Sequence, residues 1–355
     1  MSTESKKPRL FFLDNIKILF TFLVIFQHVR VTYGGTGGWY YTEAAPVDVP
    51  SMIFFITLTS IGGLFQASLM GLFFLMGGYF TPKSYDRKGA VSFWRERLVR
   101  LGIPLIVYIV LINPLLAYIS NPQGSFIDFY LSQFQSLGAF IEFLTETGPM
   151  WYVFVLLIFT AVYTLWRQIT KIDSVQHIIP KEFSIPKYFY LLFLAISLGF
   201  FTFLVRIFSP IDKFPLGIPL GFIIPYLMMF SVGVIAVRYD WFEKMTRRHV
   251  KVWAITILTA FILLTLYTLL FVGFDSDLSV FLGGFNWHAL AFTLAENVIC
   301  MGMIFVLLKI FYAKFNHQGK ILLNLSSSAF YMYLIHPPVL VFYPLDLHLY
   351  PLFLL

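Results

Sequence analysis

Apolar stretches recur along the whole of this chain, and each is long enough to cross a lipid bilayer as a helix. A bilayer core needs roughly 20 apolar residues, because a helix rises about 1.5 Å per residue. The pattern predicts an all-α fold, a polytopic membrane helical bundle with nine transmembrane helices. These spans lie at about 10–30, 52–80, 101–120, 149–166, 188–208, 218–237, 252–272, 288–308 and 323–345.

Composition supports a membrane protein. Hydrophobic residues make up 59% of the 355 residues and charged residues only 12%, about half the charged fraction of an ordinary soluble domain. The connections between spans are short and leave no room for a soluble domain. We therefore expect one membrane-embedded domain over residues 1–355, with its chemistry in or beside the membrane.

The basic residues gather on one side of the predicted bundle. With the N-terminus placed in the cytoplasm, 21 of the 25 Lys and Arg fall in the N-terminal tail and in alternate connections. This asymmetry follows the positive-inside rule and predicts a multi-pass protein of the cytoplasmic (inner) membrane, surrounded by membrane lipids. The net charge of +7 thus reflects orientation, and no nucleic-acid partner is expected.

Other classes of function find little support. Asp14 and Lys17 interrupt the start of the first span and no small-residue cleavage site follows, which favours a retained helix over a signal peptide. The single cysteine, Cys300, excludes a disulfide framework and a thiolate metal site. The seven histidines lack the spacing of metal ligands, so we expect neither a metal nor a bound cofactor.

Charged and titratable residues within the first span raise a functional question, because charge at membrane depth is costly. Lys17 and His28 are eleven residues apart, about 20° past three full helical turns, so both face the same way and lie roughly 16 Å apart along the axis. Asp14 can pair with Lys17. In one interpretation these residues are an interfacial pair and a helix cap. In the other they line a cavity, with a cation at the cytoplasmic mouth and His28 as a general base.

Five segments resemble the acyltransferase-3 family of membrane acyltransferases, in the family's order and over nearly the full chain. The first, LDNIKILFTFLVIFQH, is similar to the family's opening helix, with its Asp, then Arg, then ten residues, then His. The others are MGLFFLMGGYF (Met70–Phe80), RERLVRLGIPL (Arg95–Leu105), GPMWYVFVLL (148–157) and SSSAFYMYLIHPPVLV (Ser326–Val341).

Two departures from the family pattern matter. Lys17 stands where the family usually has Arg, which keeps the charge but loses the bidentate geometry. The family usually has ten helices and nine are predicted here. The C-terminal YPLFLL could begin a missing tenth helix, or the chain may be clipped.

The resemblance implies an enzyme that transfers an acyl group from cytoplasmic acyl-CoA to a hydroxyl of a glycan or related acceptor at the other face. Acetyl is the commonest group in the family, and succinyl stays open. His28 would deprotonate the acceptor, or would carry the acyl group transiently. Lys17, Arg97 and Arg100 would bind the CoA phosphates, although every cytoplasmic connection here is basic.

The remaining candidates support this centre. Glu296, in the middle of a span, could orient His28, hold an acceptor or pair with Arg206, which is near a helix end and could reach the interface. His336 precedes two prolines and could stabilise a helix kink or serve the substrate. Aromatic side chains proposed to bind the acceptor, or to form the interfacial aromatic belt, are Trp39, Tyr40 and Trp151.

The main alternative from another class is a multi-pass transporter or flippase of a small polar or lipid-linked substrate, which would also carry polar residues in its helices. Against it, the chain has no paired halves with matching broken spans. A non-catalytic member of the family is a third possibility, in which His28 would be replaceable.

Overall fold

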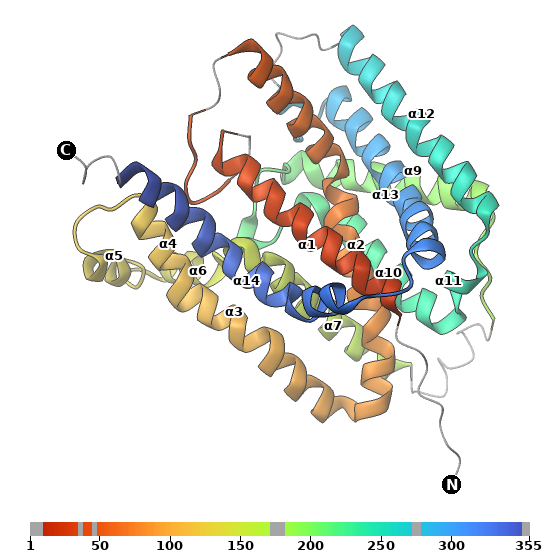
Figure 1. Ribbon diagram of the computed structural model, residues 1–355, viewed down its shortest axis with the longest axis horizontal. Helices are drawn as coiled ribbons and strands as arrows, with labels where there is room; N and C mark the ends of the chain where they lie inside the picture. Colours follow the sequence, from red (N-terminus) through yellow and green to blue (C-terminus); the bar gives the residue numbers. More distant parts are fainter. Residues whose placement is uncertain (1–9, 35–37, 45–47, 171–181, 272–277, 350–355) are drawn as a thin grey trace.

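The computed structural model describes residues 10–34, 38–44, 48–170, 182–271 and 278–349, and these form helices joined by short connections, with no strand among them (Figure 1). The long helices are α1 (Phe11–Thr32), α2 (Val49–Arg97), α7 (Trp151–Ile169), α9 (Tyr188–Phe208), α10 (Ile223–Tyr239), α12 (Arg247–Phe271), α13 (Trp287–Lys314) and α14 (Lys320–Leu349). The shorter α-helices are α3 (Ile103–Val107), α4 (Asn113–Ser120), α5 (Phe126–Ser132), α6 (Leu137–Thr145) and α11 (Trp241–Lys244). Single turns of π- or 3-10-helix occur at Leu98–Gly102, Tyr108–Ile112, Gly148–Met150, Pro215–Gly217, Leu220–Phe222 and Leu278–Phe281.

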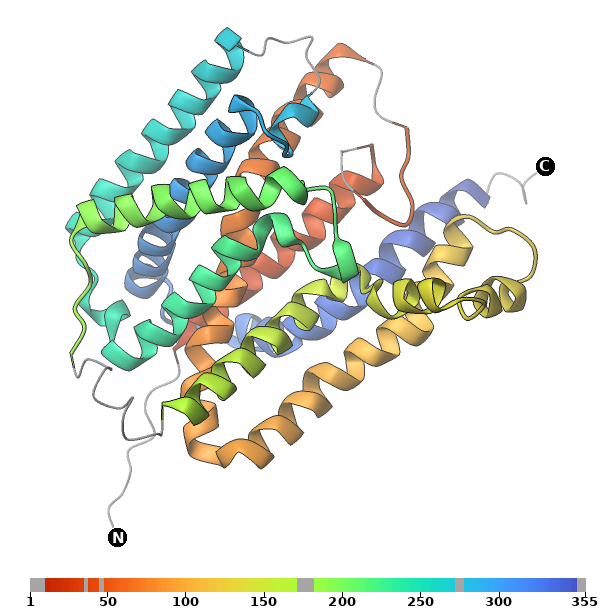
Figure 2. The same cartoon turned by 180° about the vertical axis from the view of Figure 1, so that it is seen from behind.

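The polytopic helical bundle is confirmed, and two of the nine predicted spans share one long helical segment. Eight helical segments in the described part of the chain are long and apolar enough to cross a membrane. The predicted spans at 52–80 and 101–120 fall within one helical run, because α2 continues through the π-turns into α3 and α4. Gly89 breaks this run with φ +73° and ψ 166°, a conformation that favours glycine. The bend folds the two halves of the run into separate arms (Figure 2).

Small residues bring α2 and α10 into close contact at the centre of the bundle. A Cβ atom on Gly78 would lie 2.0 Å from the carbonyl oxygen of Phe230, and one on Gly233 would lie 2.1 Å from that of Leu75. Only glycine fits at these two positions, which is how membrane helices commonly pack backbone against backbone.

Helix α13 lies at the middle of one half of the bundle and packs against α2, α9 and α12. Helix α1 packs along α14 in the other half, with Phe12, Ile16 and Phe20 in the buried core. The beginning of α1, the bend of α2 at Gly89 and helix α11 lie at the same end of the bundle in both ribbon views (Figures 1 and 2).

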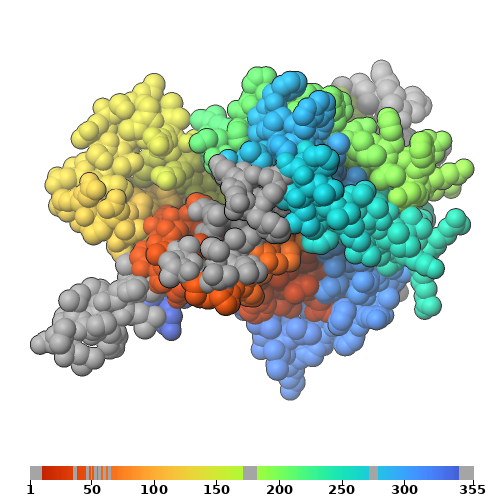
Figure 3. All heavy atoms as spheres, turned by 90° about the horizontal axis from the view of Figure 1, so that it is seen from above, coloured from red at the N-terminus to blue at the C-terminus, as the bar shows by residue number. Residues whose placement is uncertain are grey.

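The arm of α3 and α4 leads to α5 and α6, which form a lobe to one side of the bundle. Seen from above, this yellow lobe lies opposite α12 (Figure 3). The ends of α1 and α14 that carry His28 and His336 lie next to each other, because the two imidazoles are in contact. The fold thus brings two histidines 308 residues apart in sequence to one place.

Candidate active site

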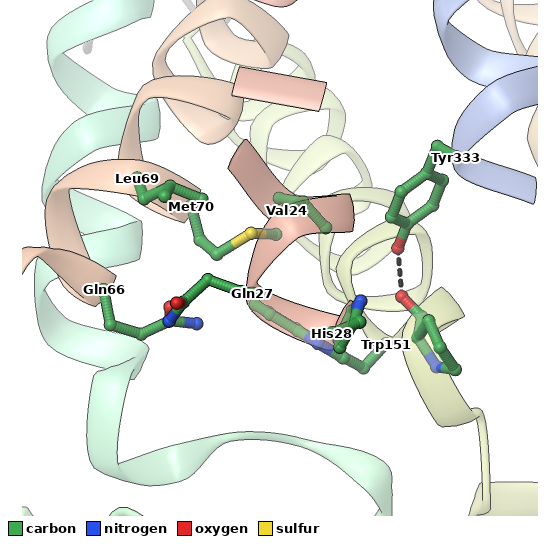
Figure 4. Close-up of a pocket in the computed structure, with 9 residues that line it drawn as sticks. Val24, Gln27, His28, Gln66, Leu69, Met70, Trp151 and Tyr333 are labelled. Carbon is green, nitrogen blue, oxygen red and sulfur yellow. Dashed lines mark hydrogen bonds between the residues drawn. The ribbon is translucent and has the colours of Figure 1, made fainter. Parts of the chain in front are cut away.

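A cavity opens between α1, α2, the start of α7 and α14, with about 330 Å³ of empty space (Figure 4). This volume includes space that is open to the surroundings of the protein. Apolar and polar side chains alternate on its wall, and His28 projects from α1 among them. The lining residues are Val24, Gln27, His28, Gln66, Leu69, Met70, Pro149, Trp151 and Tyr333.

His28 is held by a second histidine behind the cavity wall. Its Nδ1 lies 2.9 Å from Nε2 of His336, and the two rings are nearly parallel, with their centroids 4.9 Å apart. His336 is buried, whereas His28 keeps a partly exposed surface on the cavity. The arrangement resembles a base and its orienting partner, since the exposed imidazole is positioned by a buried one.

The hydrogen-bond chain fixes which nitrogen of His28 carries a proton. His336 Nδ1 is 2.6 Å from the carbonyl oxygen of Tyr333, and a carbonyl only accepts, so Nδ1 is the protonated nitrogen of His336. In the neutral ring Nε2 of His336 is then an acceptor, and His28 Nδ1–H donates to it. Nε2 of His28 is therefore left with a free lone pair, as a general base or nucleophile requires.

The local sequence of α14 explains why Tyr333 has a free carbonyl. Residue 337 would donate its backbone N–H to this oxygen in a regular helix, but Pro337 has no N–H. His336 replaces that missing bond through its own ring. The two roles considered for His336 from the sequence are therefore combined, since one ring nitrogen satisfies the proline-interrupted helix and the other contacts His28.

Of the three aromatic residues proposed to bind the acceptor, Trp39 and Trp151 lie beside His28 and Tyr40 is directed elsewhere. Trp39 stacks on His28, with ring centroids 4.1 Å apart and an angle of 16° between the planes. Trp151 lines the cavity and stacks on Tyr226, 5.6 Å between centroids. The Tyr40 hydroxyl donates a short hydrogen bond to Asn113.

Tyr40 anchors the segment that carries Trp39. Its hydroxyl also lies 3.2 Å from that of Tyr108, which is the donor because the Tyr40 proton is used on Asn113. Burial raises the pKa of the Tyr40 phenol, so it stays protonated and keeps donating. A Cβ atom on Gly148 would lie 2.3 Å from the Tyr40 oxygen, and glycine leaves room for the hydroxyl.

The basic residues proposed to bind acyl-CoA lie outside the cavity. Lys17 pairs with Asp14 at 3.3 Å, and its side chain is about one-third exposed. Arg97 turns inward, with Nη2 donating to Thr81 Oγ1 at 2.6 Å and the guanidinium over the Phe93 ring. Arg100 is exposed. Lys17 and His28 share the uninterrupted helix α1, which keeps both on one face of it.

Glu296 pairs with Arg206 rather than with His28. Arg206 Nη2 is 2.6 Å from Glu296 Oε2, and neither side chain has any exposed surface. The guanidinium also donates through Nε to the Gly221 carbonyl oxygen at 2.8 Å. The expectation that Arg206 could extend to the interface is wrong, because the carboxylate on α13 holds it in the interior.

Sequence reasoning missed several residues of the cavity wall, above all Gln27, Gln66 and Tyr333. The two glutamines stand in otherwise apolar stretches, and that was the available signal, since polar residues within a span often face a functional cavity. Tyr333 could be found only through the fold, because its hydroxyl donates to the Pro149 carbonyl oxygen and ties α14 to the start of α7.

Comparison with known proteins identifies the family of the chain. Residues 10–354 match the model of a family described as an acyltransferase domain. Glucans biosynthesis protein C of Salmonella schwarzengrund and that of Salmonella typhi are each 28% identical over 163 residues, 44% of this chain and 38% of theirs. The homologous protein of Salmonella paratyphi B is 27% identical over the same length.

The match thus covers well under half the length of these curated relatives. No solved structure matches the chain. The family model, in contrast, covers nearly all of it, from the first turn of α1 to the penultimate residue. This chain, a multi-pass membrane protein, belongs to the acyltransferase-3 family.

Proposed function

We propose that this protein is a membrane O-acyltransferase that moves an acyl group, acetyl in the first instance, from cytoplasmic acyl-CoA to a hydroxyl of a glycan on the opposite side. The observation that carries the proposal is the His28–His336 pair on the wall of a cavity. Membership of the acyltransferase-3 family supplies the class of reaction.

His28 acts as the general base in this proposal. Its free Nε2 takes the proton of the acceptor hydroxyl while the hydroxyl oxygen forms a bond to the thioester carbon. The C–S bond then breaks, and the CoA thiolate leaves and recovers the proton from the imidazolium. His336 orients the ring and stabilises its charged form by accepting from Nδ1 throughout.

A covalent route uses the same nitrogen. Nε2 of His28 attacks the thioester carbon, the C–S bond breaks, and the CoA thiolate leaves. The acceptor hydroxyl then attacks the acyl carbon, the C–N bond breaks, and the hydroxyl proton passes to the freed Nε2 and from there to the thiolate. Incubating the protein with radiolabelled acetyl-CoA, without acceptor, and then quenching in denaturant separates the routes. Label retained on the wild-type protein and lost in His28→Ala indicates the acyl-enzyme, whereas an unlabelled protein indicates direct transfer.

The donor enters from the basic side in this proposal. Arg97, already turned inward toward Thr81, and Lys17 bind the phosphates of CoA, and Arg100 adds charge at the surface. The pantetheine arm then carries the thioester along the face that Lys17 and His28 share. We expect Arg97→Ala to raise KM for acyl-CoA about tenfold, and Arg100→Ala to raise it less, since an exposed charge is screened.

The acceptor approaches from the end of the cavity where Trp39 stacks on His28, and Trp151 on the cavity wall offers an aromatic surface for a sugar. The curated relatives are named for glucan biosynthesis, which favours a glucan or similar polysaccharide as the first acceptor to test. The outer connections are rich in acids, as the sequence indicates, and would disfavour a strongly anionic acceptor.

The test compares wild type, His28→Ala and the control His317→Ala in bacterial membranes at equal protein levels. His317 is an exposed histidine that does not line the cavity. Acylation of surface and exported glycans is measured by mass spectrometry. The proposal expects acyl esters with wild type and with the control, and none above background with His28→Ala.

Two results would overturn the proposal. Full transfer by His28→Ala would remove the proposed base. Movement of a glycan or lipid-linked sugar across the membrane without any new ester would favour the transporter or flippase instead.

A further inference from the structure

The two glutamines of the cavity wall have no role in the proposal above. Gln27 directly precedes His28 on α1, and Gln66 faces the same cavity from α2 (Figure 4). A carboxamide at membrane depth is costly unless its polar atoms find partners. For Gln66 the described residues provide no hydrogen bond, so its amide is open to whatever enters the cavity.

Arg30 fixes the orientation of the Gln27 amide. Its Nε donates to Gln27 Oε1 at 3.2 Å, and a guanidinium has only donors, so the amide oxygen must face the arginine. The NH2 group of Gln27 is thereby turned away from Arg30. Because Arg30 is buried, its positive charge polarises the amide strongly and makes the NH2 a better donor.

Gly62 of α2 sets the place of that NH2 group. A Cβ atom on Gly62 would lie 2.7 Å from Gln27 Nε2 and 2.9 Å from Oε1, so the amide rests against this helix and a larger residue would displace it. Gly62 is one turn before Gln66 on the same helix. Donors from α1 and α2 thus meet on the same cavity wall as His28.

We infer that Gln27, with Gln66 as a second donor, binds the oxyanion that forms on the acyl carbonyl during transfer. The inference rests on the proposed function and deepens it by naming further catalytic residues. When the acceptor oxygen, or Nε2 of His28, bonds to the thioester carbon, the π electrons of the C=O bond move onto oxygen. Gln27 N–H donates to that oxygen until the C=O bond re-forms and the C–S bond breaks.

Such donors act on charge that develops in the transition state, so they lower the barrier without tightening ground-state binding. Removing one donor typically slows the chemical step about 10²- to 10³-fold. We therefore expect Gln27→Met to lower kcat by about that factor while KM for acetyl-CoA stays within about threefold. Gln66→Met is expected to lower kcat about tenfold, since no charged partner polarises its amide.

The experiment uses the full chain in lipid nanodiscs, with acetyl-CoA as donor and, as acceptor, the glycan that the wild-type protein acylates. Thiol release and ester formation are followed together. Phe26→Met is the matched control, because Phe26 is adjacent to Gln27 and exposed on the outside of the bundle. Gly62→Ala is a second test, because the new methyl group displaces the Gln27 amide from its place against α2 and is expected to lower kcat about tenfold.

The outcomes separate the inference from the proposed function. Transfer by wild type that is lost in His28→Ala but unchanged in Gln27→Met overturns the oxyanion role alone. A raised KM at unchanged kcat also overturns it, because Gln27 would then bind the donor in its ground state. If wild type itself transfers nothing, the proposed function fails and the inference fails with it. If Gln27→Met does not fold, unchanged kcat in Gly62→Ala rejects the inference.

Discussion

The Arg206–Glu296 pair and the His28–His336 pair both lie within long helices of this protein, and they differ in access. Arg206 and Glu296 join α9 to α13, and both are completely enclosed. His28 and His336 join α1 to α14, and His28 keeps a surface on a cavity. Both pairs are polar groups within membrane-spanning helices, so their depth alone does not indicate the role of either pair.

The surroundings of the ion pair suit a structural role. The Arg206 guanidinium lies 4.8 Å from the centre of the Phe222 ring and 5.9 Å from that of Phe292, and its Nε donates to the Gly221 carbonyl. These contacts offset part of the cost of burying the charge, and Arg206 Nη1 and Glu296 Oε1 have no hydrogen-bond partner among the described residues. A substrate could reach the pair only if the aromatic wall moved.

The histidine pair is arranged in the opposite way. Neutral imidazoles need no counter-charge, and one of the four ring nitrogens is left without a fixed partner in the chain of hydrogen bonds from Tyr333 to His28. The difference between the two pairs leads to opposite predictions. Substitutions at His28 should abolish activity with little effect on stability. Substitutions at Arg206 should lower stability with little effect on the activity of the folded protein.

The largest effect is expected for His28→Ala. Loss of the general base should lower the rate of transfer about 10³- to 10⁴-fold, while thermal unfolding in detergent shifts little, because the side chain is partly exposed. Acylation rate and melting temperature are measured on the same preparation, with His317→Ala beside it. A large decrease in the melting temperature of His28→Ala would mean that His28 stabilises the fold. The two pairs would then not differ in role.

Arg206→Ala should mainly affect stability. It leaves the Glu296 carboxylate buried and unpaired, which costs about 3–5 kcal/mol. The fraction that remains folded should transfer acyl groups at the wild-type rate. The prediction is checked by measuring the melting temperature of the variant and its rate of acyl transfer per folded molecule.

The double variant Arg206→Met/Glu296→Met sharpens this prediction. Replacing a buried ion pair by apolar side chains of similar size is often neutral, so the double variant should be more stable than Arg206→Ala. If the double variant folds well but no longer transfers acyl groups, Arg206 and Glu296 contribute to the reaction. The proposed difference between the ion pair and the histidine pair would then be wrong.

A smaller effect on the rate of transfer is expected at His336. The test is whether a second substitution that restores a hydrogen-bond acceptor also restores the rate. His336→Phe removes the acceptor for His28 Nδ1–H and should slow transfer about 10- to 100-fold, as loss of an orienting partner usually does. His336→Gln offers a carbonyl oxygen as acceptor and should recover much of that loss. Equal rates for the two variants would show that the hydrogen bond does not orient the base.

The sequence predicted the helices that carry this site better than it predicted how those helices bend and which residues contact one another. Hydropathy located the spans, and the eleven-residue spacing of Lys17 and His28 placed His28 on a polar face of the first span. The break at Gly89 was not foreseen, so two predicted spans proved to be arms of one bent helical run. A single glycine in a helical pattern is compatible with either a continuous helix or a break.

The partners of the site residues could not be predicted, because they depend on long-range packing. Glu296 had three candidate partners in the sequence, and only the fold selects Arg206. Pro337 indicated a free carbonyl in α14, but which side chain would fill it required the position of His336. Gln27 and Gln66 resembled ordinary exceptions in apolar stretches until the fold placed both on one cavity.

The smallest effect is expected for Tyr40→Phe. This variant tests whether the hydrogen bonds of Tyr40 shape the access of the acceptor to His28. The change removes the hydroxyl that donates to Asn113 and accepts from Tyr108, and so loosens the segment that holds Trp39 against His28. Each neutral hydrogen bond contributes about 1 kcal/mol, so we expect a few-fold change in KM for the glycan and almost none in KM for acyl-CoA. Tyr41→Phe, a neighbouring phenol, is the control. A change in KM for the glycan alone would indicate that Tyr40 keeps the access to the His28–His336 pair open, in contrast to the enclosed ion pair. An equal change in KM for both substrates would indicate that Tyr40 has only a structural role.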